Sequence, residues 1–308
     1  MQRKTILLAG ASGTIGRAVA HALLADGHDV VCLLRDSESG REAAQALKQA
    51  GAAITFGDWS DVRADTVVSC IASRTGSPKD ARAVDYQANA DLLAAAEKGG
   101  VKHFILLSAI CVQRPRLAFQ HAKLAFEAEL QASPIDWTVI RPTAFFKSLS
   151  GQVERVRKGK PFLLFGDGQQ TRCKPISDGD LARFIADCVT NPGRCNQVLP
   201  VGGPGPAISP REQGEMLFEL TGQEPRYRSI SPSLFKAASR VLSLGAGVSG
   251  WLAEKAEYAR IAHYYATESM LVLNSETVEY DADATPEFGS DTLHDHYATL
   301  LAAQKEQA

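Results

Sequence analysis

Three glycines lie in the segment GASGTIG (residues 10–16), between a short apolar run, Lys4–Ala9, and a stretch with helical spacing. One face of that helix carries Ile15, Val19, Ala22 and Leu23. In a strand–loop–helix turn, the first glycine allows the tight turn, the second lets backbone approach a pyrophosphate, and the third lets helix pack on strand. Free N–H groups at the helix start then meet the phosphates. The pattern predicts a dinucleotide-binding loop made of Gly10, Ser12, Gly13, Thr14, Ile15 and Gly16.

Apolar runs alternate with helical stretches through the rest of the first half of the chain. The runs predict further strands at Asp29–Leu34, Ala53–Phe56, Thr66–Cys70 and His103–Leu107. Their near-continuous apolar character is typical of parallel strands covered on both faces. A second helix is predicted over about Asp80–Lys98, with a buried face made of Val84, Ala88, Leu92 and Ala95. The alternation predicts an α/β fold with a doubly wound parallel Rossmann sheet.

The end of the second strand indicates which dinucleotide is bound. A carboxylate at this place binds the 2′-hydroxyl of NAD, whereas an arginine accommodates the 2′-phosphate of NADP. Arg35 occupies the place, and Asp36 follows it on the opposite side of an extended chain. A guanidinium binds a phosphate through two hydrogen bonds, so the predicted cofactor is NADPH. The alternative is that Arg35 is an ordinary surface charge.

Three more positions are candidates for cofactor contact. Asp58 follows the third strand, where short-chain dehydrogenases bind the adenine amino group, although an aspartate there is equally typical of a turn. Ala72 and Ser73 follow the fourth strand, where such folds pass the second phosphate and the nicotinamide ribose.

The second half of the chain is less regular. Proline and glycine clusters mark loops, and helices are predicted at about residues 178–190, 210–221, 233–244 and 250–265. We expect an NADP-binding Rossmann domain over residues 1–200, with part of the substrate pocket from about 145–172. A smaller, mostly helical substrate lobe or lid follows over residues 201–308. Residues 231–265 are apolar and interrupted by small residues, which is typical of a packed helical hairpin or of a lid over an apolar ligand.

Composition excludes several classes of function. Lysine and arginine number 33 against 35 acidic residues, and this balance gives no basic surface for nucleic acid, so none is predicted as a partner. The six cysteines lack the spacing of a metal site, so no metal is predicted and the thiols are expected to be reduced and buried. No uncharged run approaches the roughly 20 residues that span a bilayer. A cytoplasmic protein is expected.

The segment FQHAK (residues 119–123) carries a lysine but no tyrosine four residues before it. The glycine spacing of residues 10–16 resembles that of the short-chain dehydrogenases. There, a tyrosine at the place of Phe119 exchanges a proton with substrate oxygen, and a lysine at the place of Lys123 lowers the pKa of that tyrosine and holds the nicotinamide ribose. Ser108 matches the serine of that family. Three explanations remain open: an NADPH sensor without chemistry, another proton donor, or reduction of a carbon–carbon double bond.

Longer segments resemble a particular group of atypical, NmrA-like short-chain dehydrogenases, the NADPH-dependent divinyl (proto)chlorophyllide 8-vinyl reductases. The segments are LLSAICVQ (106–113), FQHAKLAFEAEL (119–130), RPTAFFKSLSG (141–151), KGKPFLLFGDG (158–168), CKPISDGD (173–180), LPVGGPGPAISPREQGEMLF (199–218), YYATESML (264–271) and YDADAT (280–285). The resemblance covers nearly the whole chain, and the phenylalanine of F-x-x-x-K is part of it. It implies reduction of the C8 vinyl group of a Mg-containing divinyl chlorophyllide-type pigment in chlorophyll or bacteriochlorophyll biosynthesis, with at most peripheral contact with photosynthetic membranes.

The resemblance implies an apolar pocket for a flat macrocycle. Candidate substrate-binding residues are Phe119, Phe145, Phe146 and Tyr264, although adjacent phenylalanines cannot both point the same way. Basic residues at 155, 157, 158 and 160 are candidates for the pigment's propionate, or are simply solvated. His121 lies about 200° around its helix from Phe119 and is expected to face away. Lys123 is the candidate catalytic residue. The rival functions are a non-catalytic NADP-binding regulator and a double-bond reductase of the isoflavone reductase type.

Overall fold

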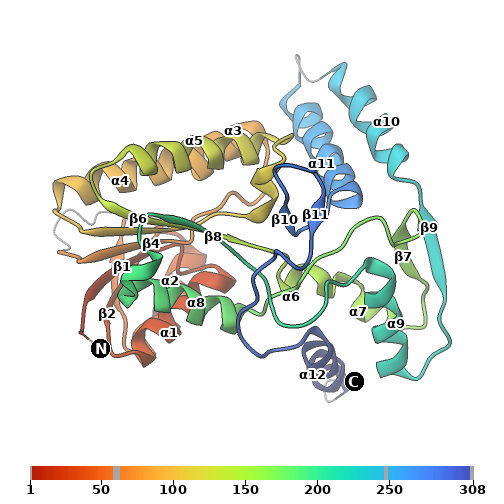
Figure 1. Ribbon diagram of the computed structural model, residues 1–308, viewed down its shortest axis with the longest axis horizontal. Helices are drawn as coiled ribbons and strands as arrows, with labels where there is room; N and C mark the ends of the chain where they lie inside the picture. The colour runs from red at the N-terminus through yellow and green to blue at the C-terminus, as the bar shows by residue number, and fades with distance from the viewer. Residues whose placement is uncertain (1, 58–62, 246–248, 306–308) are drawn as a thin grey trace.

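The computed structural model describes residues 2–57, 63–245 and 249–305. Its centre is a seven-stranded sheet in the order β3-β2-β1-β4-β5-β6-β8, and every neighbouring pair is parallel (Figure 1). The strands are β1 (Thr5–Ala9), β2 (Asp29–Leu34), β3 (Ala53–Phe56), β4 (Thr66–Ser69), β5 (His103–Leu107), β6 (Asp136–Pro142) and β8 (Gln197–Val201). The predicted doubly wound parallel sheet is confirmed, and the five predicted strands agree with it to within one residue at each end.

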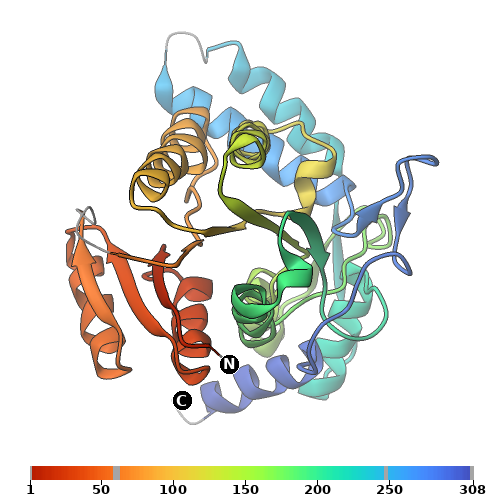
Figure 2. The ribbon, with the colours of Figure 1, turned by 60° about the vertical axis from the view of Figure 1, so that its left-hand side comes forward.

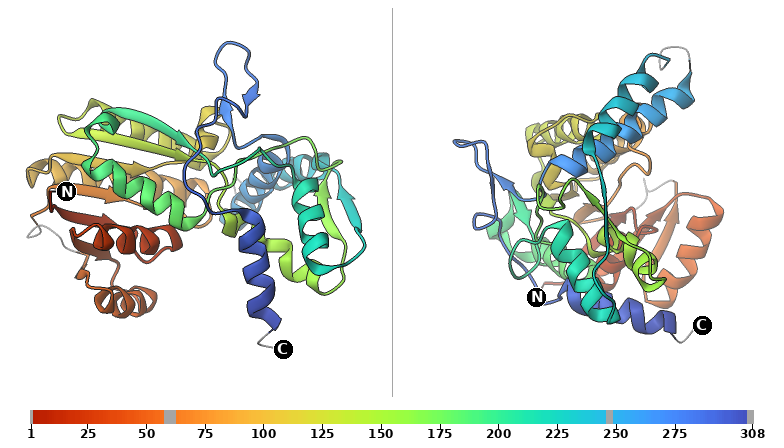
Figure 3. Two further views of the ribbon diagram at one scale, coloured as in Figure 1. Left: turned by 60° about the horizontal axis from the view of Figure 1, so that its bottom comes forward. Right: turned by 90° about the vertical axis from the view of Figure 1, so that its right-hand side faces the viewer.

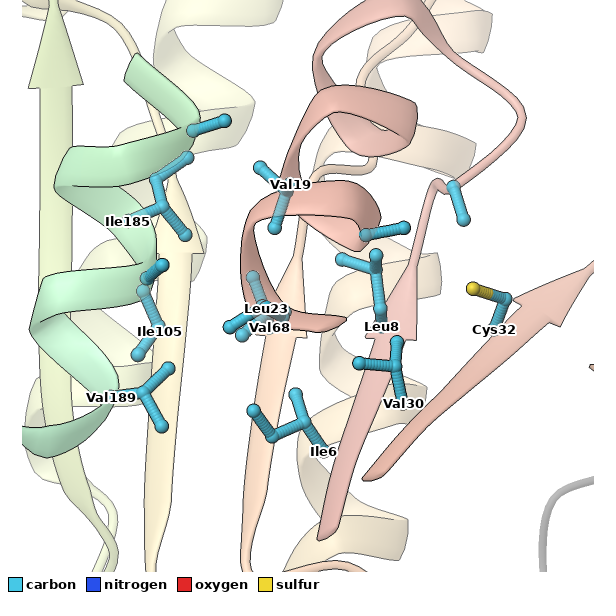
Figure 4. Packing of buried hydrophobic residues seen from close by; sticks show 14 of the residues in the cluster. Ile6, Leu8, Val19, Leu23, Val30, Cys32, Val68, Ile105, Ile185 and Val189 are labelled. Atoms are coloured by element: carbon cyan, nitrogen blue, oxygen red, sulfur yellow. The ribbon is translucent and has the colours of Figure 1, made fainter. Parts of the chain in front are cut away.

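Helices cover both faces of the sheet (Figure 2). One face is covered by α1 (Thr14–Ala25), α2 (Glu38–Gln49) and α8 (Asp178–Thr190), and the other by α4 (Ala88–Lys98) and α5 (Ala118–Ala132). Figure 4 shows Val19 and Leu23 of α1 beside Leu8, with Ile185 and Val189 of α8 packed on the neighbouring strands. The near-continuous apolar character of the strands follows from this double coverage.

The predicted helix over residues 80–98 is three helical pieces, α3 (Pro78–Asp80), the π-helical η1 (Ala81–Gln87) and α4. Its buried face differs from the predicted one, because Asp85 and Asn89 are buried where Val84 and Ala88 were expected. Both polar side chains have partners: Asn89 accepts from Ser69 Oγ at 2.5 Å, and Asp85 pairs with a lysine of α5. Apolar periodicity therefore identified the helix but not the register of its inner face.

A third apolar cluster lies beyond the carboxyl ends of the strands and is built from segments that precede and follow β8 in the chain. It contains residues of α6 (Phe146–Leu149), α7 (Val153–Arg157), β7 (Phe162–Phe165), α9 (Pro210–Thr221) and α12 (Leu293–Lys305). Strand β7 pairs in parallel with β9 (Tyr227–Ile230), which follows α9 in the chain. Short elements η3 (Ser150–Gln152), η2 (Ile110–Gln113) and η4 (Pro192–Arg194) connect the larger ones.

Helices α10 (Pro232–Ser243) and α11 (Gly250–Thr267) form a hairpin that projects from the body (Figure 3, right). The antiparallel pair β10 (Val272–Leu273) and β11 (Tyr280–Asp281) follows. All four helices predicted in the second half are present, with ends that differ by at most two residues. The six cysteines are free, as predicted, and burial raises the pKa of Cys32, Cys70, Cys173 and Cys188 to about 12. Among the described helices, none combines the length and apolar character needed to cross a membrane.

Candidate functional site

In the glycine loop between β1 and α1, backbone packs on backbone too closely for larger side chains at two of the three glycines. Gly10 has φ +84°, and a Cβ there would lie 2.6 Å from the Cys70 carbonyl carbon. A Cβ on Gly16 would collide with the carbonyl oxygen of Gly10. Gly13 stands at the N-cap of α1, so no capping side chain occupies the free N–H groups of the first turn. This backbone fits the pyrophosphate of a dinucleotide.

A lysine that the sequence reasoning did not single out lies beside this loop. Lys147 of α6 donates from Nζ to Thr14 Oγ1 at 2.7 Å. Its ammonium therefore stands at the N-terminus of α1, where an anion is already favoured by the helix dipole. The only sequence signal was its place, five residues after the end of β6 within RPTAFFKSLSG. Lys147 is a further candidate for a phosphate contact.

Arg35 and Asp36 lie at the end of β2, where the contact with the cofactor ribose or its phosphate was predicted. Asp36 forms an exposed ion pair with Arg41 of α2 at 2.8 Å. Arg35 contributes to lowering the pKa of Asp80, although hydrogen bonds from the Thr75 backbone are the largest cause. The loop after β4 leads from that strand to Asp80 and contains two of the predicted contacts. Ser73 lies in that loop and donates its N–H to Asp85 Oδ1 at 3.3 Å, and Ala72 precedes it with its side chain exposed. Asp58 lies outside the described residues.

Lys123 forms a buried ion pair with Asp85. The Nζ of Lys123 lies 3.0 Å from Asp85 Oδ1, and the two side chains are 9% and 1% exposed. The second carboxylate oxygen, Oδ2, is buried and has no hydrogen-bond partner among the described residues. A buried carboxylate oxygen without a donor is costly unless a bound group supplies one. The pair therefore fits a ligand that carries hydroxyl groups, such as the ribose of a nicotinamide nucleotide.

Ser108 belongs to a second buried polar group. Its hydroxyl donates to Glu127 of α5, and Glu127 pairs with Arg141 at the end of β6. Glu127 is almost fully buried, whereas Arg141 retains some exposure. The structure thus places Ser108 directly after β5, as predicted, with its hydroxyl bonded to a carboxylate. Neither Glu127 nor Arg141 was singled out in the sequence, although both fall in the segments 119–130 and 141–151.

Phe119 lies against α11. It belongs to a small apolar cluster with Cys111, Leu117, Ile261, Tyr264 and Met270. The Tyr264 hydroxyl donates to the Cys111 carbonyl at 2.8 Å, and burial raises the pKa of this tyrosine to about 12. Tyr264 is therefore a buried support for Phe119.

His121 is exposed on the other side of α5, as predicted, where it lines a shallow groove with Arg82 and Tyr86.

The two adjacent phenylalanines diverge, as their positions predict. Phe146 is buried in the cluster of α6, α7 and α9, with its ring centroid 5.3 Å from that of His296. Phe145 is half-buried at the edge of the sheet core. Of the two, Phe145 therefore has the freer ring.

A groove of about 790 Å³ lies between α7, the β7–β9 pair and α10. Its lining combines apolar side chains with two arginines: Leu163, Ile230, Leu234, Ala237, Arg155 and Arg228. The volume falls in the range of roughly 300–1,000 Å³ that small-molecule sites occupy.

Of the basic run considered for a propionate, Arg157 and Lys158 both bond Glu154 and lower its pKa to about 2. Arg155 instead faces the groove.

Comparisons with known proteins show what this chain is similar to. A family model described as NAD(P)H-binding matches residues 10–192. Divinyl chlorophyllide a 8-vinyl-reductase, chloroplastic, from Cucumis sativus is 46% identical over 96% of this chain and 76% of its own length. The protein of that name from Arabidopsis thaliana is 45% identical over the same shares. AtPrR2, solved with NADP+ and (+)pinoresinol, matches in fold with a TM-score of 0.71 at 18% identity, covering 97% of this chain and 99% of that one.

Proposed function

The chain belongs to the divinyl chlorophyllide a 8-vinyl-reductase family, and we propose that it uses NADPH to reduce the 8-vinyl group of a divinyl chlorophyllide-type pigment. It is an oxidoreductase of chlorophyll biosynthesis with a nicotinamide cofactor. The observation that supports the finer proposal is the buried Lys123–Asp85 pair. The second carboxylate oxygen of the pair, Asp85 Oδ2, has no hydrogen-bond partner among the described residues. Four residues before Lys123, Phe119 carries no phenol. The membership disfavours both the regulator and the reductase of the isoflavone type.

The residues around Lys123 suit reduction of a carbon–carbon double bond. When bound, NADPH supplies a hydride, the conjugated macrocycle delocalises the resulting charge, and a proton completes the ethyl group. Lys123 and Asp85 would hold the ribose hydroxyls, one as donor and the other as acceptor. Holding both ribose hydroxyls fixes the reacting ring, and such positioning is a large part of catalysis. Phe119 would place an apolar ring against the pigment. A phenol is not needed at this position, because the reaction protonates no substrate oxygen.

The substitution Phe119→Tyr is expected to bring no gain in turnover, with kcat changed by less than about threefold. A phenol at this position would enter an apolar cluster with Ile261 and Tyr264, and the reaction has no developing oxyanion for it to protonate. Steady-state rates with NADPH and divinyl chlorophyllide measure the effect. A rise of tenfold or more would show that the site lacks an acid it needs.

The substitution Arg35→Ala is expected to raise the Kd of NADPH by about tenfold or more, while that of NADH stays unchanged. The guanidinium would otherwise bind the 2′-phosphate, which NADH lacks. Fluorescence titration with the two nucleotides measures both constants. Arg3→Ala is a matched control, because Arg3 is exposed and pairs with Asp29 at the opposite end of the same strand. Equal losses for the two nucleotides would contradict the role of Arg35.

We propose that different parts of the chain bind the cofactor and the pigment. Residues 1–200 hold the cofactor, with Gly10, Ser12, Gly13, Thr14, Ile15 and Gly16 around the phosphates and Ala72, Ser73 and Ser108 toward the nicotinamide. Asp58 is proposed for the adenine. Residues 201–308, together with about 145–172, form the pigment side, where Phe119 and Phe145 face the ligand and Phe146 and Tyr264 support them. The protein is proposed to act beside photosynthetic membranes, since the named relatives are chloroplastic.

One experiment tests the activity itself. The protein is mixed with NADPH and divinyl chlorophyllide, the Soret band is followed, and the pigment is separated by chromatography. Conversion to the 8-ethyl pigment supports the proposal. Unchanged pigment with demonstrated NADPH binding would favour a regulator, and turnover of an enone or phenolic substrate in its place would favour a reductase of the isoflavone type.

A further inference from the structure

Exposed apolar side chains gather on the α10–α11 hairpin. Of the eight large apolar side chains that are exposed among the described residues, five lie on these two helices and a sixth, Leu244, lies directly after α10. The four most exposed are Leu244 at 88%, Tyr258 at 69%, Val241 at 67% and Trp251 at 63%. Monomeric proteins rarely gather exposed apolar groups in this way unless the surface meets a partner. The patch is here called the hairpin face, defined by Leu234, Val241, Leu244, Trp251, Tyr258 and Tyr265.

The hairpin face is one-sided on each helix. Leu234 and Val241 of α10 and Leu244 at its C-cap lie within about a quarter of the helix circumference, given 3.6 residues per turn. On α11, Trp251, Tyr258 and Tyr265 recur every seven residues and form one aromatic row. The opposite sides of the two helices pack on each other and on the body, so each helix has one apolar side that the protein does not cover.

Positive charge borders the hairpin face. Helix α10 carries Lys236 and Arg240, which are exposed and lie next to the apolar side, and it has no acidic residue. On α11, Lys255 lies 5.8 Å from the centroid of the Trp251 ring. Over the two helices together, four basic residues outnumber two acidic ones, the exposed Glu254 and the buried Glu257. The whole chain has a net charge of −2, so this positive charge is local. Exposed leucine, valine and tryptophan beside lysine and arginine are the composition of helices that lie in the interface of an anionic bilayer.

The hairpin is firmly joined to the body at its base, beside the candidate site. Glu257 of α11 is buried, accepts from the Ala118 N–H at 3.0 Å and pairs with Arg260 at 2.8 Å. Ile261 and Tyr264 then pack against Phe119. The outer part of the hairpin can therefore meet a partner while its base keeps a fixed relation to Lys123.

We propose that the hairpin face docks on an anionic lipid bilayer, with its apolar side chains in the interface and Lys236, Arg240 and Lys255 among the headgroups. A second copy of the chain fits less well, because a symmetric contact would bring the same basic residues of α10 together. Docking on lipid does not depend on the reductase assignment. Its use, the uptake of an apolar pigment from the bilayer close to the site, rests on the proposed function.

Vesicle cosedimentation with the full chain tests the docking. The protein is expected to bind vesicles of equal parts phosphatidylglycerol and phosphatidylcholine, and to bind pure phosphatidylcholine at least tenfold more weakly. Leu244→Ser combined with Trp251→Ser should reduce binding to the anionic vesicles at least tenfold. Val278→Ser, which removes an exposed apolar side chain outside the hairpin, should leave it unchanged. NADPH titration shows that each variant is folded.

A charge reversal tests the second half of the proposal. Lys236→Glu combined with Arg240→Glu should reduce binding to the anionic vesicles at least tenfold. The matched control combines Lys48→Glu with Lys102→Glu, at two exposed positions outside the hairpin. This double variant should reduce binding to the anionic vesicles less than threefold. Wild-type protein that does not bind the anionic vesicles, or hairpin variants that bind as the wild type does, would overturn the proposal. Self-association that the Leu244 and Trp251 changes abolish, without vesicle binding, would overturn it in favour of a second copy. Neither result bears on pigment turnover, which is measured separately.

Discussion

Lys123→Ala is expected to lower kcat/KM for pigment reduction by about 100-fold or more. The substitution removes the buried cation proposed to hold the nicotinamide ribose, and a displacement of the reacting groups by about 1 Å can cost that much. Turnover of divinyl chlorophyllide with NADPH, followed by chromatography, measures the loss. Lys98→Ala is a suitable control, since Lys98 is exposed at the end of α4. A rate close to that of the wild type would remove Lys123 from the mechanism.

The loss in Lys123→Ala has to be separated from a loss of folding. Removing the lysine leaves Asp85 buried and unpaired, and an uncompensated buried charge destabilises a protein by roughly 3–5 kcal/mol. The double variant Lys123→Met with Asp85→Asn removes both charges and keeps an oxygen that can accept from Ser73. It is expected to regain most of the thermal stability while staying inactive. A double variant that regains turnover would show that the pair serves only the fold.

Glu127→Ala is expected to destabilise the protein strongly although Glu127 lies outside the apolar core. Glu127 is almost fully buried, accepts from Ser108 and pairs with Arg141. Without it, Arg141 and the Ser108 hydroxyl lose their partner in the protein interior. A cost of about 3 kcal/mol follows, somewhat reduced by the partial exposure of Arg141. In a chain of this size the Tm should fall by roughly 6 °C or more.

Thermal unfolding in the absence of nucleotide measures this effect. Glu97→Ala is the matched control, because Glu97 is a helical glutamate on the exposed side of α4, and its Tm should change little. Glu127→Gln keeps the shape and an acceptor oxygen, so it should lie between the two. A Tm for Glu127→Ala equal to that of the control would mean that the carboxylate contributes nothing to stability.

Much of the fold was predictable from the sequence because its signals are local. Apolar runs bounded by turns identified five strands, and helices were predicted in the second half between loops marked by proline and glycine. The structure adds a local signal that was not used: at the start of α9, the side chains of Ser209 and Glu212 each accept from the other's backbone N–H. The glycine loop was predictable for a similar reason, since Gly10 has φ +84° and Gly13 and Gly16 both pack against the Gly10 carbonyl within seven residues.

The residues that sequence reasoning missed depend on contacts between distant segments. Asp85 lies in a π-helical segment before α4 and is buried opposite Lys123, and no local pattern marks a charged residue as buried there. Lys147 is distant in sequence from Thr14, the residue it bonds. Glu127 and Arg141 looked like ordinary charges on a helix and a strand. Each of these roles arises only when the sheet has brought its strand ends together.

The parallel pairing of β7 with β9 has a consequence for how the protein holds together. β7 precedes the last strand of the large sheet, whereas β9 follows it, so the pairing joins the segments before and after β8 by main-chain hydrogen bonds. The cluster beneath it takes Phe162 from before β8, and Leu217 and Tyr297 from after it. A polypeptide ending at residue 201 would leave β7 as an unpaired edge above exposed apolar side chains, a recognised hazard for aggregation. The division of labour between cofactor side and pigment side is therefore not a division into autonomous folding units.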